Sequence, residues 1–100
     1  MKYNKLVRDN IPEYIQEKGG EPQYHVADET EYWEKLKDKL IEEVQEFNND
    51  ESPAEIADIL EVLNAITAYK NFDPKKIESI RNKKAQERGI FRKRIILEES

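Results

Sequence analysis

Four carboxylates in two regularly spaced pairs are the residues of this chain best suited to chemistry. Glu43 and Glu46 form the first pair and Glu55 and Asp58 the second, each with i, i+3 spacing. On a helix this spacing places both members of a pair on one face. Four carboxylates held together repel one another and take up protons unless cations compensate their charge. Such oxygen ligands suit a hard divalent cation, Mg²⁺ with Mn²⁺ as an alternative.

Two apolar stripes predict the helices that would position these pairs. At about 100° per residue, Glu43 falls inside the first stripe and Glu46 lies at its edge. Glu55 lies beside the second stripe, and Asp58 lies at its margin. The first stripe consists of Trp33, Leu36, Leu40, Val44 and Phe47, and the second of Ile56, Ile59, Leu63 and Ile66.

Local start signals give the bounds of the two helices. Asp28 begins an Asp-x-x-Glu capping box, and Ser52 followed by Pro53 suits an N-cap and a first helical position. The sequence therefore predicts a hairpin of helices over residues 29–48 and 53–71, with the four carboxylates near its turn.

A purely structural role for the acids is the alternative. Ser52-x-x-Glu55 also fits a capping box, in which Glu55 would only satisfy backbone donors. In a chain with 22 Asp and Glu residues, i, i+3 acid pairs also arise by chance. Either pair alone favours this structural role, whereas two pairs on facing stripes across one short turn favour a metal site.

The rest of the chain adds short elements around the hairpin. Helices are predicted for residues 11–18, before two glycines, and for residues 74–88, which follow a cap-then-proline start and precede Gly89. The sequence also allows a short two-stranded β pairing of residues 24–26 with 95–97, which would need to lie on the helices because isolated pairs are marginal. The predicted fold class is all-α, or mainly α with that pairing.

Length and composition fit one small helical domain over residues 1–100. Hydrophobic residues make up 37% and charged residues 39% of the chain, a mixture that suits amphipathic helices. Two short neighbours leave too little of the hairpin's apolar surface covered. We therefore expect a homodimer or higher homo-oligomer that extends the bundle to at least four long helices.

Several classes of protein do not fit the composition. A net charge of −5 argues against a general nucleic-acid binder. No run approaches the roughly 20 apolar residues of a membrane span, and no apolar N-terminal segment resembles a signal peptide. The chain has no cysteine, which excludes disulfides and thiolate metal sites. We expect a soluble, cytoplasmic protein without a membrane partner.

The acid motifs resemble those of a known enzyme superfamily. Glu42-Glu43-x-x-Glu46 followed by Glu55-x-x-Asp58 is similar to the signature of the all-α nucleoside triphosphate pyrophosphohydrolases, the MazG-like and phosphoribosyl-ATP pyrophosphohydrolase-like superfamily. Residues 3–12 and 83–91 resemble the flanks of its small single-domain branch, so the likeness covers most of the chain. Only eight residues separate Glu46 from Glu55, a short turn compared with many relatives.

The resemblance implies a reaction and roles for residues. The reaction is Mg²⁺-dependent cleavage of a nucleoside triphosphate between the α and β phosphates, giving a nucleoside monophosphate and pyrophosphate, with non-standard or surplus nucleotides as substrates. Glu43, Glu46, Glu55 and Asp58 are the expected metal ligands. Glu42 and Glu43 are the catalytic candidates. Glu42 lies about 100° from Glu43 and away from the apolar stripe, so from its position it either orients a water or is plain surface, and its place in the motif keeps it as a candidate base.

Two basic groups are candidates for binding the substrate phosphates. Lys84 and Arg88 share one helical face, with Arg81 next along it; the alternative is a solvated face paired with nearby glutamates. In the N-terminal arm, the resemblance implies phosphate contacts for Lys5 and Arg8, and the alternative is a solvated arm.

Two other functions remain compatible with the sequence. One is hydrolysis of phosphoribosyl-ATP, which uses the same chemistry on another substrate. The other is a non-enzymatic, acidic helical interaction module, in which the carboxylates only cap helices and solvate the surface.

Overall fold

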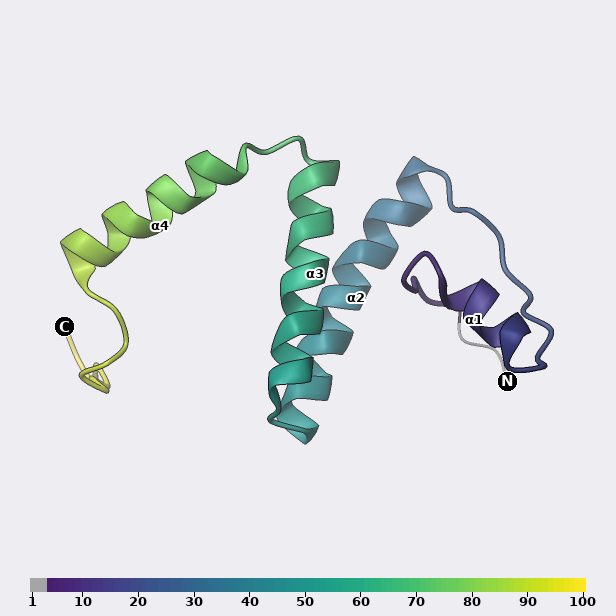
Figure 1. The fold of residues 1–100 in the computed structure, drawn as a ribbon. Coiled ribbons are helices and arrows are strands. Elements are labelled where there is room, and N and C mark those ends of the chain that lie inside the picture. Colours follow the sequence, from purple (N-terminus) through teal and green to yellow (C-terminus); the bar gives the residue numbers. More distant parts are fainter. Residues whose placement is uncertain (1–3) are drawn as a thin grey trace.

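Four helices make up the regular structure of the chain in a computed structural model that describes residues 4–100. They are α1 (Ile11–Glu17), α2 (Glu29–Asn49), α3 (Pro53–Tyr69) and α4 (Pro74–Arg88), shown in Figure 1. Their bounds lie within two residues of the predicted ones, which confirms the all-α prediction. Tyr3, the first residue of the N-terminal flank, lies outside the described residues.

The predicted β pairing is wrong. Within residues 4–100 the chain contains no strand, and both residues 24–26 and residues 95–97 are irregular and exposed. The apolar side chains there gave each segment strand character, but a two-stranded pair is stable only when a helix face or a third strand covers it. Figure 1 shows the two segments on opposite sides of the hairpin, so neither can pair with the other.

The α2–α3 hairpin is the centre of the structure, and its two helices run antiparallel on either side of a short turn (Figure 1). The carboxylate of Asp28 accepts a hydrogen bond from the Glu31 N–H at 2.9 Å, as expected of an N-cap. Pro53 occupies the first turn of α3, where its missing N–H costs nothing. The turn therefore places the C-terminal end of α2 beside the first turns of α3.

Apolar contacts hold the hairpin together along its length. Leu36 and Val62 are buried between the helices. Toward the open end, the rings of Trp33 and Tyr69 stack with their centroids 5.1 Å apart, and Tyr32 packs edge-on against Tyr69 at 5.5 Å. The tryptophan and both tyrosines therefore serve as packing residues that fix how far the two helices lie apart.

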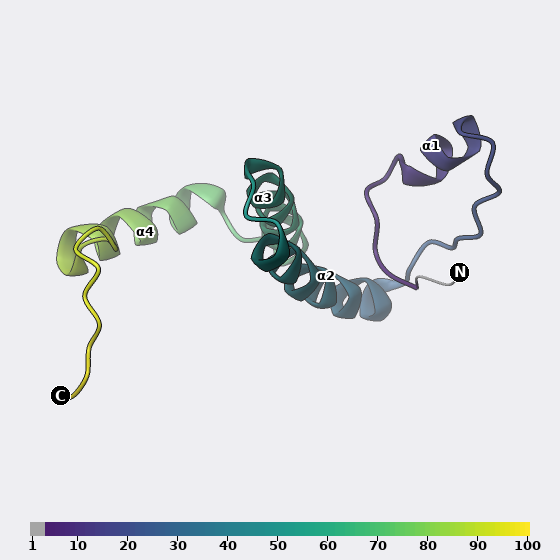
Figure 2. The same ribbon diagram turned by 90° about the horizontal axis from the view of Figure 1, so that it is seen from below.

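The chain as a whole is extended. Its radius of gyration is 17.7 Å, against roughly 13 Å for a compact domain of this length. Figures 1 and 2 show α4 leaving the open end of the hairpin on one side and α1 standing off on the other. Large apolar side chains on the hairpin, on α4 and in residues 90–97 therefore remain exposed.

None of the helices in residues 4–100 combines the length and the apolar character that crossing a bilayer requires.

Candidate metal centre

Three of the four predicted ligands come together at the hairpin turn. Glu43, Glu55 and Asp58 can each offer one carboxylate oxygen, and these three atoms lie within 4.8 Å of one another. Glu43 comes from α2, and the other two come from the first two turns of α3. Glu43 is only 8% exposed and is the one charged residue buried in the described part of the chain. The site therefore combines carboxylates from two helices, with Glu43 twelve residues before Glu55 in the sequence.

Glu46, the fourth predicted ligand, is exposed and lies outside this group of three. It is nevertheless close enough for its charge to act on Glu55. Glu46 therefore lies beside the three carboxylates and contributes negative charge to the site.

The charge of the site acts most clearly on Glu55. Desolvation and then the neighbouring charges of Asp58, Glu46 and Glu43 raise the pKa of Glu55 above its ordinary value of 4.5. Within residues 4–100, no lysine or arginine forms an ion pair with Glu55. These carboxylates repel one another, so a cation between them would relieve the repulsion. Each offers a carboxylate oxygen, the type of ligand that Mg²⁺ and Mn²⁺ prefer, so the three residues fit such an ion.

The structural alternative for Glu55 is not realised. The capping box requires the Ser52 side chain to bind a backbone N–H of α3, but Ser52 forms no such hydrogen bond. Its hydroxyl instead donates to Asp50 at 3.4 Å, and its own N–H donates to the Asp50 carbonyl at 2.7 Å. The Ser52 oxygen therefore accepts no backbone N–H of α3, and the Ser52 N–H that Glu55 would bind in a capping box is directed to Asp50, so Glu55 has no capping role.

The raised pKa of Glu55 predicts that replacing this carboxylate with a neutral side chain stabilises the fold, and that the gain depends on pH. A carboxyl whose folded pKa exceeds its unfolded pKa destabilises the fold as pH rises through that window, because the folded state then loses its extra proton. We expect metal-free Glu55→Gln to melt at a higher temperature than the parent at pH 7, with the difference narrowing near pH 4. Thermal unfolding followed by circular dichroism checks this. An unchanged melting temperature at pH 7 would show that no net repulsion acts on Glu55.

The N-terminal arm, residues 4–10, reaches this same site. Arg8 donates to the Asp58 carboxylate at 2.9 Å, and Lys5 lies 2.6 Å from Glu42. The partners are 50 and 37 residues apart in the sequence. Exposed pairs of this kind contribute only about 0–1 kcal/mol to stability. Their importance is therefore positional, because they bring two cations to the edge of the acidic group.

Glu42 is neither plain surface nor a member of the group of three. Partial burial by itself would raise the pKa of Glu42, but hydrogen bonds from Lys5 and Lys39 outweigh it and lower that pKa below 4.5. Lys39 lies 3.2 Å from Glu42 and 3.2 Å from Glu43. Glu42 therefore stays ionised and holds two lysines beside the site.

Lys39 is a site residue that the sequence analysis missed. Its side chain is only 17% exposed, and it contacts both adjacent glutamates of the acid motif. The signal was present in the sequence, since Lys39 lies three and four residues before Glu42 and Glu43 and so shares their side of α2.

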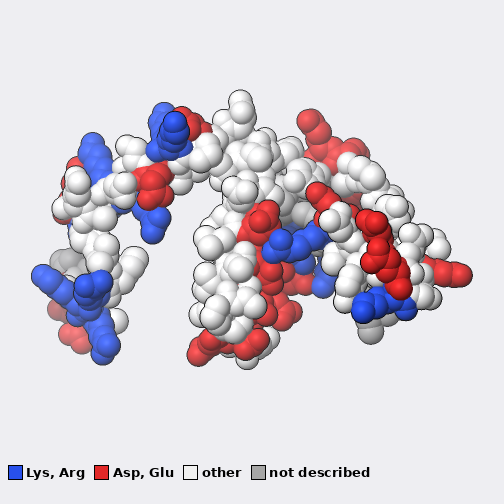
Figure 3. Space-filling view, viewed as in Figure 1, with Lys and Arg blue, Asp and Glu red and all other residues white. Residues whose placement is uncertain are grey.

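The basic residues predicted on α4 do not approach the carboxylates within one chain. Arg81, Lys84 and Arg88 lie on a helix that leaves the opposite end of the hairpin (Figure 1), and Arg81 pairs with Glu78 at 3.3 Å. Figure 3 shows acidic side chains gathered over the hairpin, with basic side chains beside them and further basic side chains spread over α4 and the C-terminal segment.

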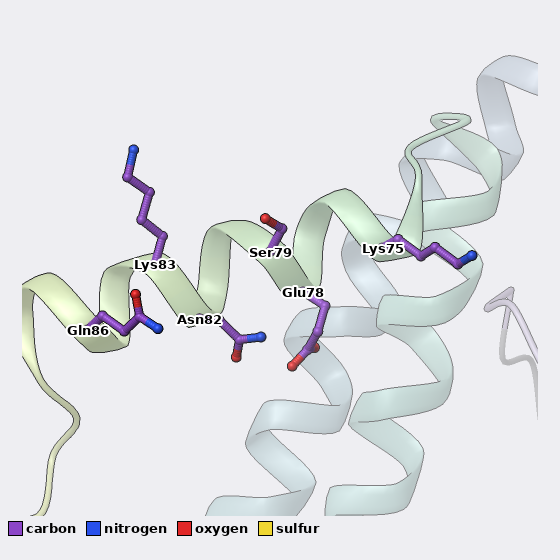
Figure 4. Close-up of a pocket in the computed structure, with 6 residues that line it drawn as sticks. All are labelled: Lys75, Glu78, Ser79, Asn82, Lys83 and Gln86. Carbon is purple, nitrogen blue, oxygen red and sulfur yellow. The ribbon is translucent and has the colours of Figure 1, made fainter.

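A hollow of about 470 Å³ on the surface of α4 is not an alternative metal or substrate site. It is lined by Lys75, Glu78, Ser79, Asn82, Lys83 and Gln86 (Figure 4). All six residues belong to α4, so the hollow is an open helix face without an opposing wall. None of Glu43, Glu55 and Asp58 lines it.

Comparison with protein-family models finds no match, and comparison with curated proteins and with solved structures finds no significant match.

Proposed function

We propose that the chain is a Mg²⁺-dependent nucleoside triphosphate pyrophosphohydrolase that releases pyrophosphate and a nucleoside monophosphate. The observation that carries this proposal is the meeting of Glu43, Glu55 and Asp58 within 4.8 Å, with Glu43 buried. The resemblance of the acid motifs and of both flanks to the MazG-like superfamily supports the same reaction. Removal of non-standard or surplus nucleotides in the cytoplasm is the role that this resemblance suggests.

The carboxylates have distinct roles in this proposal. Glu43, Glu55 and Asp58 would hold the metal ion, and Glu46, whose charge acts on Glu55, would add negative charge beside them. Mg²⁺ supplies neutralisation of the triphosphate charge and acidification of the attacking water. A carboxylate with a lowered pKa is a weak general base at neutral pH, so we assign Glu42 to positioning Lys5 and Lys39 and leave proton transfer to Glu43.

Lys5 and Arg8 of the N-terminal arm are the predicted phosphate-binding residues that lie at the site within a single chain. Arg8 and Lys5 already lie against oxygen anions, and an arginine fork or a lysine ammonium binds phosphate oxygens in the same way. The α4 cations Arg81, Lys84 and Arg88 would need to come from a second copy of the chain.

A homodimer or larger assembly is part of the proposal. In the described residues only two apolar side chains, Leu36 and Val62, are buried, whereas many large ones remain exposed. The hairpin and α4 would bury these side chains against another copy, because small helical units form stable cores by completing a bundle.

Pyrophosphate release from a panel of nucleoside triphosphates and phosphoribosyl-ATP, each with Mg²⁺, tests the function. We expect saturable Mg²⁺ binding and release from at least one nucleoside triphosphate. Release from phosphoribosyl-ATP alone would instead identify the second candidate substrate. Absence of saturable Mg²⁺ binding and of any release would identify a non-enzymatic interaction module.

A further inference from the structure

A small cleft lies between the N-terminal arm and α2, next to the three carboxylates of Glu43, Glu55 and Asp58. Its volume is about 50 Å³, and by such a measure one water needs roughly 10–15 Å³. The cleft therefore has room for several waters or for one group of phosphoryl size. It is lined by Asn4, Lys5 and Leu6 of the arm and by Lys35, Asp38, Lys39 and Glu42 of α2.

The charge of the cleft favours an anion. Three ammonium groups line it against two carboxylates, so its lining carries a net positive charge although the chain is acidic overall. Lys35 is only partly exposed, and no residue of the described chain forms an ion pair with it. A partly desolvated ammonium group without a counter-ion gains more from binding an anion than a fully hydrated one.

The cleft is adjacent to the three carboxylates, and Lys39 contacts both. Lys39 lines the cleft, and its Nζ also lies 3.2 Å from Oε1 of Glu43, a member of the group of three. An anion held by Lys39 would thus lie next to a cation held by Glu43. Adjacent sites for a divalent cation and an anion are what a metal-bound polyphosphate requires.

We propose that this cleft binds one terminal phosphate of the substrate, and hence one end of the pyrophosphate product, with Lys35 and Lys39 as its principal ligands. The identity of the anion rests on the proposed function. Lys35 and Lys39 are one turn apart on α2, so the helix places both side chains on the same face, beside the cleft. Lys5 of the arm completes the subsite from the other side.

Calorimetric titration with inorganic pyrophosphate in the presence of Mg²⁺ tests the subsite directly. We expect Lys35→Gln and Lys39→Gln each to weaken pyrophosphate binding at least tenfold, equivalent to about 1.4 kcal/mol. Lys37→Gln is the matched control, since Lys37 lies on the same helix between them in sequence but faces Trp33 and does not line the cleft. The control is expected to bind pyrophosphate like the parent.

A second titration separates anion binding from a merely structural role of Lys39. If Lys39 only held Glu43 in place, Lys39→Gln would weaken Mg²⁺ binding in the absence of pyrophosphate. We expect Mg²⁺ affinity to be unchanged or higher, because removing a cation beside Glu43 favours another cation there. Weaker Mg²⁺ binding with unchanged pyrophosphate binding would overturn the proposal.

The same titrations test the subsite independently of whether the chain hydrolyses nucleotides. Pyrophosphate binding needs no turnover, so loss of binding in both cleft variants supports the subsite even if no nucleotide is hydrolysed. Parent-like pyrophosphate binding in Lys35→Gln and Lys39→Gln overturns the subsite even if nucleotides are hydrolysed. A loss confined to Lys84→Gln would likewise overturn it and place the phosphates on α4 of another copy.

Discussion

Replacing Glu43 with Gln, or Asp58 with Asn, is expected to abolish Mg²⁺-dependent pyrophosphate release while the helices stay folded. Each amide keeps the shape of the acid but removes one negative charge from a group whose oxygens lie within 4.8 Å. A divalent cation loses a charged ligand, and the catalytic effect of the ion is lost with it. Pyrophosphate release and Mg²⁺ titration measure the loss, and circular dichroism measures the fold.

Stability without metal gives this experiment a second readout. We expect both variants to melt at the parent temperature or above it, because lost repulsion offsets the lost pairs with Lys39 and Arg8. Glu34→Gln is the matched control, since Glu34 is an exposed acid of α2 outside the site. Unfolding of both variants would show that the acids are structural, and retained turnover would contradict the metal assignment.

The second large effect concerns assembly, and it is expected on substituting the outer face of α3. Ile56, Leu60 and Leu63 lie at i, i+4 and i+7 on that face and are 44%, 60% and 42% exposed. Val62 on the opposite side is buried against α2. A helix with apolar residues on both sides is normally buried on both sides. We therefore expect the parent chain to sediment as a dimer or larger species at micromolar concentration.

In that assembly Leu60→Glu should weaken association at least 100-fold. Burial of a leucine side chain is worth about 1.5–3 kcal/mol, and a two-fold interface loses it twice, while each 1.4 kcal/mol is a factor of ten. Ala68→Glu is the control, because it adds the same charge at an exposed position of α3 outside this face. A parent chain that sediments as a compact monomer would rule out the assembly.

The helices were predictable because local chemistry decides where they begin and end. Asp28 caps α2 with its own carboxylate, and Pro53 and Pro74 open α3 and α4. Gly89 ends α4 with φ of 83°, a backbone conformation that other residues adopt at a cost. The strand pairing failed for the opposite reason, since it depended on a distant partner and a covering surface.

The candidate site was predictable in part. Glu55 and Asp58 share one helix, so their i, i+3 spacing alone brings them together. Their meeting with Glu43 follows from the short turn. The spacing could not decide that Glu43 is buried and Glu46 exposed, because that difference depends on how α2 is rotated against α3.

Local signals in the sequence therefore predicted the helices and the short turn that brings the carboxylates of α2 and α3 near one another. Only the tertiary structure decided which cations accompany them. The predicted candidates on α4 lie away from the site, whereas Lys5 and Arg8 reach it across 37 and 50 residues. The physical reason is that ion pairs between distant segments depend on the path of the irregular arm, which no helical periodicity encodes.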